Sequence, residues 1–274
     1  MRYLKNAFDL YINSSIHVSL SVVALSLISI FEYGLTLDLE FILFIFLASI
    51  TGYNFVKYAG VAKLHHLSLA RNLRLIQLFS LLCFIGLVFL IFKLELRVVI
   101  AGGILGLITI LYALPVFGKE RNLRKVAGLK IFVIALVWAG STVILPLVNE
   151  ADVLSLQYLV GFFQRIAFIV VLTLPFEIRD LDYDEESLGT IPQKIGIHKT
   201  KLFGSFLLLL IFMIELFRSN FQSSGFLSLV SVLVVSGIFL WRSKREQSEY
   251  YSSFWVEAIP ILYLGIFIVF RHYL

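Results

Sequence analysis

The sequence predicts an all-α, polytopic membrane protein. Of its 274 residues, 59% are hydrophobic and 15% are charged, and the mean hydropathy is +0.93. About a quarter of the residues of an average soluble domain are charged, so this chain is far more apolar than a soluble protein. The apolar residues gather in stretches that are long enough to cross about 30 Å of hydrocarbon, some of them only just. We expect one transmembrane domain over residues 1–274.

Nine such stretches predict nine transmembrane helices. In order along the chain they cover residues 16–31, 39–56, 73–92, 96–115, 127–148, 157–176, 202–217, 226–241 and 255–270. The stretches at 16–31, 202–217 and 226–241 are short and extend through flanking Ser, Asn and Phe residues. The number of helices follows from the pattern more firmly than their boundaries do.

The basic residues predict the orientation of these helices. If the amino terminus lies in the cytoplasm, eighteen of the 23 Lys and Arg residues fall on the cytoplasmic side. Such an excess is the usual positive-inside signature, and it predicts an inner (plasma) membrane protein with the carboxyl terminus outside. The net charge of +5 therefore reports topology, and the sequence has no soluble basic face that would indicate a nucleic-acid partner.

An acidic run at the end of the sixth predicted helix carries the functional signal. It reads Glu-Ile-Arg-Asp-Leu-Asp-Tyr-Asp over residues 177–184. If the run is helical, Glu177, Asp180 and Asp184 share one face, where three like charges repel each other. A hard divalent cation relieves that repulsion, since Mg²⁺ takes carboxylate oxygens and often shares phosphate ligands. The alternative is a solvated acidic loop, although an anionic cytoplasmic leaflet disfavours acid close to it.

These motifs resemble the UbiA superfamily of intramembrane prenyltransferases over essentially the whole chain. The similarity rests on the nine predicted helices, on Tyr-Ala-Leu-Pro at 112–115 before the basic loop at 119–125, and on the acidic run followed by Gly189, Thr190, Pro192 and Gly196. The acidic run is the most specific part, because Asp180 and Asp184 occupy the two positions of the second aspartate-rich motif of that family.

The resemblance implies a fold and an activity. The helices would surround a central cavity in which Mg²⁺ assists the loss of diphosphate from a prenyl diphosphate, and a lipophilic acceptor, aromatic or other, would take the isoprenoid chain. The implied metal ligands are Glu177, Asp180 and Asp184. Arg179 would act with the two aspartates in catalysis. The implied substrate-binding residues are Asn54, Lys57, Tyr112, Lys119 and Lys194.

The chain departs from the family at the first aspartate-rich motif. Asn54 matches the family pattern, but Phe55, Tyr58 and Ala62 stand where carboxylates are usual. Two Mg²⁺ ions held by carboxylates from both helices would therefore not form in the usual way, and one ion on Asp180 and Asp184 could remain. Lys57 either contacts the phosphate directly in place of the missing metal or simply reaches the membrane surface.

Three functions remain open from the sequence. The first is a membrane prenyltransferase that requires Mg²⁺, and the second is a catalytically degenerate relative that binds a lipid, a quinone-like ligand or a membrane partner. The third is a transporter, which would need ionisable residues along a path through the membrane. Arg165 and Glu257 fall within predicted helices, and since isolated charges are costly there, they could pair with each other.

Overall fold

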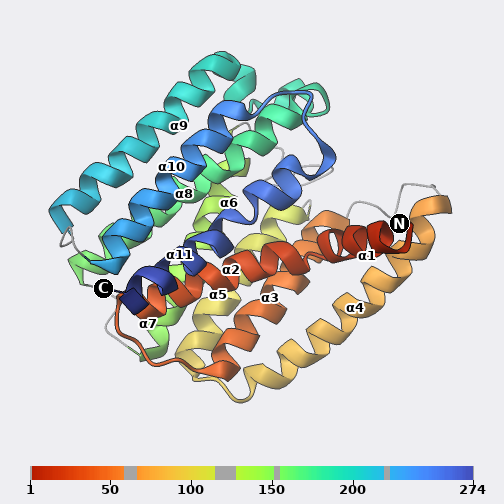
Figure 1. The fold of residues 1–274 in the computed structure, drawn as a ribbon. Coiled ribbons are helices and arrows are strands. Elements are labelled where there is room, and N and C mark those ends of the chain that lie inside the picture. Colours follow the sequence, from red (N-terminus) through yellow and green to blue (C-terminus); the bar gives the residue numbers. More distant parts are fainter. Residues whose placement is uncertain (1, 59–66, 115–127, 151–154, 219–222, 274) are drawn as a thin grey trace.

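The protein is a bundle of long helices, as the sequence predicts (Figure 1). A computed structural model describes residues 2–58, 67–114, 128–150, 155–218 and 223–273. Within these ranges, eight helices are long and apolar enough to cross a membrane, and a bent pair at the amino terminus would make nine. The predicted class of an all-α polytopic membrane protein is therefore confirmed.

The structure describes eleven α-helices in chain order. They are α1 (Arg2–Asn13), α2 (Ile16–Glu32), α3 (Leu39–Tyr58), α4 (Leu67–Ile91), α5 (Leu96–Ala113), α6 (Lys130–Ala139), α7 (Leu145–Glu150), α8 (Leu156–Arg179), α9 (Ile191–Arg218), α10 (Ser224–Arg242) and α11 (Ile259–Tyr273). A wide π turn at Gly140–Ile144 joins α6 and α7 into one crossing, and another at Tyr251–Val256 leads into α11.

Proline explains both wide turns. Pro146 and Pro260 lack the backbone N–H that an α-helix needs, and a proline ring clashes with the carbonyl four residues before it. Those carbonyls belong to Thr142 and Val256, and each lies in one of the π turns. A widened turn relieves this clash without ending the helix.

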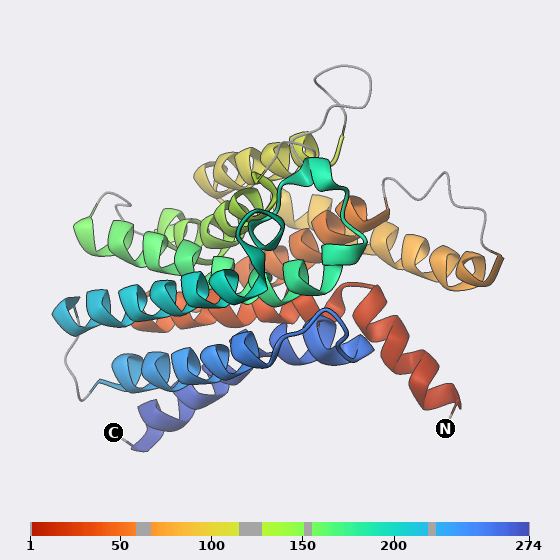
Figure 2. The ribbon, with the colours of Figure 1, turned by 90° about the horizontal axis from the view of Figure 1, so that it is seen from above.

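The helix α1 bends away from the bundle at the start of α2 (Figure 2). The two helix axes differ by 54°, and Ser15 at the corner has a positive φ of 63°. Tyr250 fastens α1 to the other end of the chain by donating a hydrogen bond to Asp9 at 2.5 Å. This hydrogen bond raises the pKa of Tyr250 to about 12.

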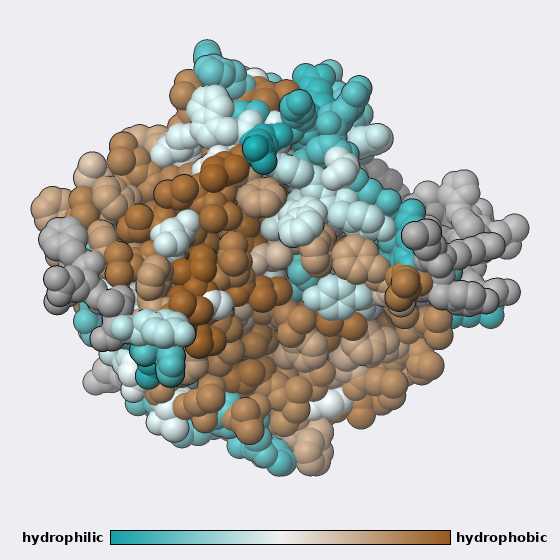
Figure 3. Space-filling view, viewed as in Figure 1, coloured by the Kyte–Doolittle hydropathy of each residue, from teal (hydrophilic) through white to brown (hydrophobic). Residues whose placement is uncertain are grey.

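The bundle has an inner layer and an outer layer. The helices α2 and α8 lie inside, since α2 packs on α3 and α11 while α8 packs on α6, α9 and α10. In the most apolar part of each helix, 56% of the residues of the α8 span are buried, whereas 11% of those of α5 are buried. The outward side chains of α4 and α5 are almost all Leu, Ile, Val and Phe. Figure 3 shows a largely apolar face on the side of the bundle seen in Figure 1, with hydrophilic residues mainly toward its edges.

Small residues let the inner helices approach each other closely. Buried serines of α2 donate hydrogen bonds to backbone carbonyls one turn earlier in the same helix. Ser26 donates to the Val22 carbonyl, and Ser29 donates to the Leu25 carbonyl. Membrane helices often pack through such small residues, because lipid gives them little hydrophobic drive to associate. At Gly204 of α9, an added Cβ would lie 2.5 Å from Leu240 and 2.8 Å from Leu174.

We expect Gly204→Leu to lower the thermal-unfolding midpoint of the purified protein in detergent. The new side chain would overpack the junction of α8, α9 and α10, and overpacking costs about 1–3 kcal/mol. Gly103→Leu is the matched control, because Gly103 faces open space on α5. Equal midpoints for the two variants would show that this junction is not closely packed.

Candidate functional site

The acidic run lies where α8 ends and the chain turns back into α9. The α-helix stops at Arg179, and residues Asp180–Asp182 form a 3₁₀ turn. Glu177, Asp180 and Asp184 therefore do not share one face of a single helix, and that prediction was wrong. The hydrogen bond from the Asp184 N–H to the Asp180 carbonyl, at 2.8 Å, closes the turn instead. The turn still keeps both aspartates within electrostatic range of Glu177.

The residues after the acidic run build the start of α9. Gly189 takes a left-handed conformation with φ 51°, which glycine adopts without steric cost. The side chain of Gln193 then reaches back and accepts a hydrogen bond from the Thr190 N–H at 2.9 Å. This is half of a capping box, and Pro192 suits the first turn of a helix. The Gly-Thr-x-Pro segment at residues 189–192 thus has a structural role at the start of α9.

Basic side chains hold both aspartates of the motif. Arg179 donates two hydrogen bonds to the Asp180 carboxylate, at 2.7 and 3.1 Å. Lys130, the first residue of α6, donates to Asp184 at 3.1 Å, and both of these side chains are largely buried. Lys130 is a site residue that the sequence analysis missed. The available signal was a lysine in the first turn of the predicted helix at 127–148, on the same side of the membrane as the acidic run.

Glu177 is the buried acid of the group. It is 3% exposed, and Lys130, Asp184 and Asp180 lie within electrostatic range of it. One of its oxygens, Oε2, is buried without a hydrogen-bond partner among the described residues. A buried carboxylate oxygen without a partner is costly and calls for a cation or a proton.

Asn54 is tied into the fold by three hydrogen bonds. Its Oδ1 accepts from the Ser15 hydroxyl at 2.8 Å, and its Nδ2 donates to the Ser14 carbonyl at 3.0 Å and to the Ser80 hydroxyl at 2.7 Å. The residue is 3% exposed. It joins the corner between α1 and α2 to α3 and α4, and this role explains an asparagine here without any substrate.

Lys57 lies one turn further along α3 and is exposed. Its Nζ is 3.4 Å from both the carbonyl and the Oδ1 of Asn13, and Glu257 and Arg179 act on it electrostatically. Whether it contacts a phosphate or reaches the membrane surface stays a prediction. The predicted pair between Arg165 and Glu257 does not form, because Arg165 bonds to Leu25 and Ser29 of α2.

Aromatic side chains lie next to these charges. The rings of Tyr53 and Trp138 meet edge to face at 6.2 Å, and the Trp138 N–H donates to the Tyr53 hydroxyl. Tyr112, 5% exposed at the end of α5, lies within electrostatic range of Tyr53. Glu257 also acts on Tyr53, so this aromatic group and the Lys57 region are continuous.

The remaining two predicted substrate-binding residues lie apart. Lys194 is exposed on the first turns of α9, and its Nζ is 3.5 Å from the place where a Cβ on Gly128 would stand. This position is beside Gly189, at the same end of the bundle as the motif. Lys119 lies outside the described residues, and the predicted central cavity stays a prediction.

Comparison with solved structures identifies the fold. A structure of a digeranylgeranylglyceryl phosphate synthase aligns over 100% of both chains, with a TM-score of 0.58 and 17% sequence identity. A UbiA homolog from Archaeoglobus fulgidus aligns over 99% of this chain and 100% of its own, with a TM-score of 0.58 and 12% identity. The chain has the UbiA fold. The resemblance predicted from the sequence is thus confirmed for the fold, whereas no protein-family model and no curated protein sequence matches the chain.

The carboxylates at the end of α8 could act as ligands for a magnesium ion. The donors near the motif are carboxylates, which Mg²⁺ prefers, and the Glu177 oxygen without a partner is a ready ligand. On α3, Asn54 and Lys57 bring no carboxylate to a second ion. Within the described ranges, no three acidic, His or Cys side chains already stand close enough to hold a metal. Lys130 and Arg179 would have to release the aspartates to an incoming ion.

We expect Asn54→Leu to destabilise the protein. The change removes three hydrogen bonds and leaves the Ser14 carbonyl and two serine hydroxyls without this partner, at a cost of about 1–3 kcal/mol for each group that stays unsatisfied. Thermal unfolding in detergent measures the effect, with Asn149→Leu as the control on α7. A variant as stable as the original protein would show that Asn54 serves the substrate rather than the fold.

Proposed function

We propose that the protein is a membrane prenyltransferase that moves an isoprenoid chain from a prenyl diphosphate to a lipophilic acceptor. One observation carries the proposal: in a UbiA-type fold, two basic residues lie on the paired aspartates around the buried acid Glu177. The arrangement gathers three acids and two bases at one end of the bundle. A diphosphate together with one divalent cation matches that set of charges.

The basic residues would bind the diphosphate. Arg179 offers a planar guanidinium that fits two phosphate oxygens, and Lys130 offers a compact charge. In the absence of substrate, both side chains bond to carboxylates at distances of 2.7 to 3.1 Å. Mg²⁺ held by Asp180, Asp184 and Glu177 would supply the charge that stabilises the departing diphosphate. Lys57 would add a further positive charge from α3.

The aromatic group would surround the reacting carbon. Loss of diphosphate from an allylic donor leaves a carbocation, and the ring faces of Tyr53, Tyr112 and Trp138 can stabilise positive charge. A dry apolar wall also keeps water from capturing the cation before the acceptor does. The acceptor would enter from the bilayer, since the outer helices present an apolar surface to lipid.

The orientation of the site follows from the basic residues. We infer that the acidic run faces the cytoplasm, because the topology predicted from the sequence puts it on the same side as eighteen of the 23 Lys and Arg residues. Water-soluble diphosphate products would then leave into the cytoplasm. The amino terminus would lie inside and the carboxyl terminus outside.

A second candidate function is binding without catalysis. The observation in its favour is that Asp180 and Asp184 already pair with Arg179 and Lys130, while the end of α3 from Asn54 to Tyr58 has no carboxylate. Aspartates that already have basic partners need not recruit a metal. Such a protein would hold a lipid or quinone-like ligand, or a membrane partner, and would release no pyrophosphate.

We expect the double variant Asp180→Asn, Asp184→Asn to lose pyrophosphate release in lipid vesicles supplied with Mg²⁺ and prenyl diphosphates from geranyl upwards. Amide oxygens hold Mg²⁺ far more weakly than carboxylates, so the rate should fall by about a hundredfold or more. Asp182→Asn is the control, because Asp182 is exposed on the same turn and binds Arg245 at 3.1 Å. Folded protein that never releases pyrophosphate but still binds the diphosphate would favour the second candidate.

We expect Lys130→Gln to weaken the binding of a prenyl diphosphate. Loss of one charge-assisted hydrogen bond to phosphate costs about 1.5–3 kcal/mol, which is roughly ten- to a hundredfold in Kd. Lys201→Gln is the control, since Lys201 at the same end of the bundle bonds to the Trp241 carbonyl instead. Unchanged affinity in Lys130→Gln would remove Lys130 from the proposed site.

A further inference from the structure

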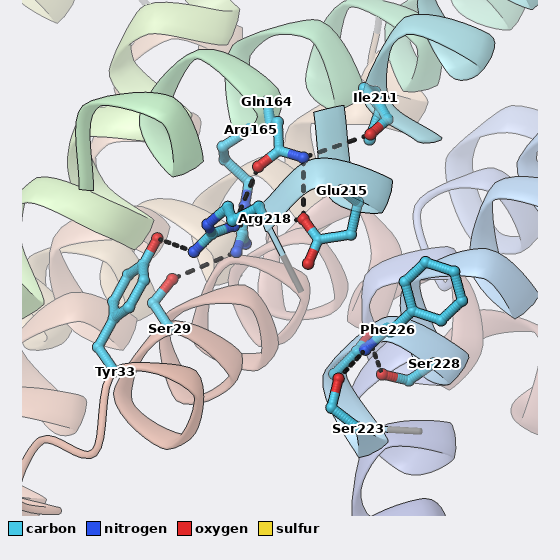
Figure 4. Close-up of polar contacts among 11 residues, drawn as sticks. Ser29, Tyr33, Gln164, Arg165, Ile211, Glu215, Arg218, Ser223, Phe226 and Ser228 are labelled. Carbon is cyan, nitrogen blue, oxygen red and sulfur yellow. Dashed lines mark hydrogen bonds and ion pairs between the residues drawn. The ribbon is translucent and has the colours of Figure 1, made fainter. Parts of the chain in front are cut away.

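A second group of charged residues lies at the opposite end of the bundle, where α2 and α9 end (Figure 4). Arg218 donates to the Gln164 side chain at 3.0 Å and lies 3.4 Å from the Glu215 carboxylate and 3.5 Å from the Tyr33 hydroxyl. Gln164 in turn donates to Glu215 at 3.0 Å. These contacts fix the Arg218 guanidinium between α2, α8 and α9.

Gly161 makes this arrangement possible. A Cβ at Gly161 would stand 2.0 Å from the Tyr33 hydroxyl and 3.6 Å from the Arg218 guanidinium. Any larger residue would push Tyr33 out of place, so the site depends on a bare backbone at this point of α8. Tyr33 also packs edge to face against Tyr158, with ring centres 4.9 Å apart.

Glu32 is the acid of this group that lacks a direct partner. Arg218 and Arg165 act on it electrostatically, yet its carboxylate makes no hydrogen bond or ion pair with any residue that the structure describes. One of its oxygens lies beside the first turn of α10, 3.5 Å from where a Cβ on Gly225 would stand. Since Glu215 already binds Gln164 and Arg218, Glu32 is the carboxylate left to receive a donor from outside.

A cavity of about 470 Å³ opens next to Glu32. Glu32 and Arg218 form part of its wall, and Arg271 of α11 and the serines at the start of α10 complete the polar side. Phe31 and Phe267, stacked with ring centres 6.1 Å apart, form an apolar side. The Arg271 guanidinium lies over the Phe31 ring at 4.9 Å, which leaves its N–H groups available at the edge of the cavity.

The lining carries both signs of charge, and this decides the ligand. A simple anion would meet the Glu32 carboxylate, and a simple cation would meet Arg218 and Arg271. A zwitterion satisfies both, with an ammonium group on Glu32 and a phosphate on the two arginines and the N–H groups at the start of α10. Glu32 needs a hydrogen-bond donor, and a primary ammonium has three while a quaternary ammonium has none.

We propose that this cavity binds the headgroup of a phosphatidylethanolamine from the surrounding leaflet. The headgroup carries one primary ammonium and one phosphodiester, so it matches the lining in charge and in hydrogen bonding. The acyl chains would lie along the exposed apolar side chains of α11, such as Ile268 and Val269, which are 50% and 53% exposed. The proposal is independent of the prenyltransferase function, because it concerns the other end of the bundle.

The test is lipid retention by native mass spectrometry of the purified full chain, after exchange into equal mixtures of phosphatidylethanolamine, phosphatidylcholine and phosphatidylglycerol with the same acyl chains. We expect phosphatidylethanolamine to be retained about tenfold more than either other lipid. Glu32→Gln should reduce that preference to about onefold, because a neutral amide no longer attracts the ammonium. Glu95→Gln should keep the preference, since Glu95 lies outside the cavity and binds Arg97 at 2.6 Å.

A second variant keeps the test decisive if Glu32→Gln fails to fold. Arg271 is exposed at the end of α11, and Arg271→Gln should lower retention of phosphatidylethanolamine at least fivefold with little effect on thermal unfolding. Equal retention of the three lipids, stronger retention of phosphatidylglycerol, or an unchanged preference in both variants would overturn the proposal. Displacement of the lipid by free glycerophosphoethanolamine at equal concentration would also overturn it, because the ligand would then be a soluble headgroup.

Discussion

Charge buried inside a membrane protein must be balanced where it lies, and this constraint shapes both ends of the bundle. Hydrocarbon and packed side chains offer no water to stabilise an isolated ion, so each ionised group needs a partner within a few ångströms. The motif end balances Asp180 with Arg179 and Asp184 with Lys130. The opposite end balances Glu215 with Arg218. Between the ends, buried serines such as Ser26 and Ser29 donate hydrogen bonds to carbonyls of their own helix.

The same constraint accounts for the unusual α3. In this helix, Lys57 adds a positive charge at the place where the sequence lacks acids, and its electrostatic partner Glu257 comes from the segment before α11. The π turn at Tyr251–Val256, which Pro260 favours, comes directly before Glu257. An acid from the segment before α11 acts on Lys57 electrostatically without restoring a metal ligand on α3. The proposed site is therefore built around one acidic helix end, α8, and around cations from α3, α6 and α8 itself.

Close packing is what allows such pairs to form across helices. Gly204 brings α9 against α8 and α10, and Gly161 lets Tyr33 reach the region of Arg218. At the corner between α1 and α2, Asn54 replaces packing with hydrogen bonds and holds three chain segments together. These residues are small or polar rather than charged, yet they set the distances over which the charges act. Substitutions far from the acids would therefore disturb the site through geometry alone.

The sequence by itself determined the class, the helix count and the place of the acidic run. Those features depend on local composition, since a span of about 20 apolar residues must be a helix in lipid whatever surrounds it. Arg179 and both aspartates could be found in the same way, because a specific spacing marks them. The capping of α9 by Gln193 is equally local.

Only the tertiary structure decided how the charges are paired. Lys130 is 54 residues from Asp184, and the partners of Arg165 lie more than a hundred residues before it. The helix α8 ends at Arg179, so Glu177, Asp180 and Asp184 do not lie on one helical face. The spacing of residues along the sequence did not predict this end. Coulomb forces between distant residues depend on helix packing, and packing is set by the fit of many side chains at once. The sequence therefore indicated which charged residues belong to the candidate site, and the packing of the helices determined which of them form pairs.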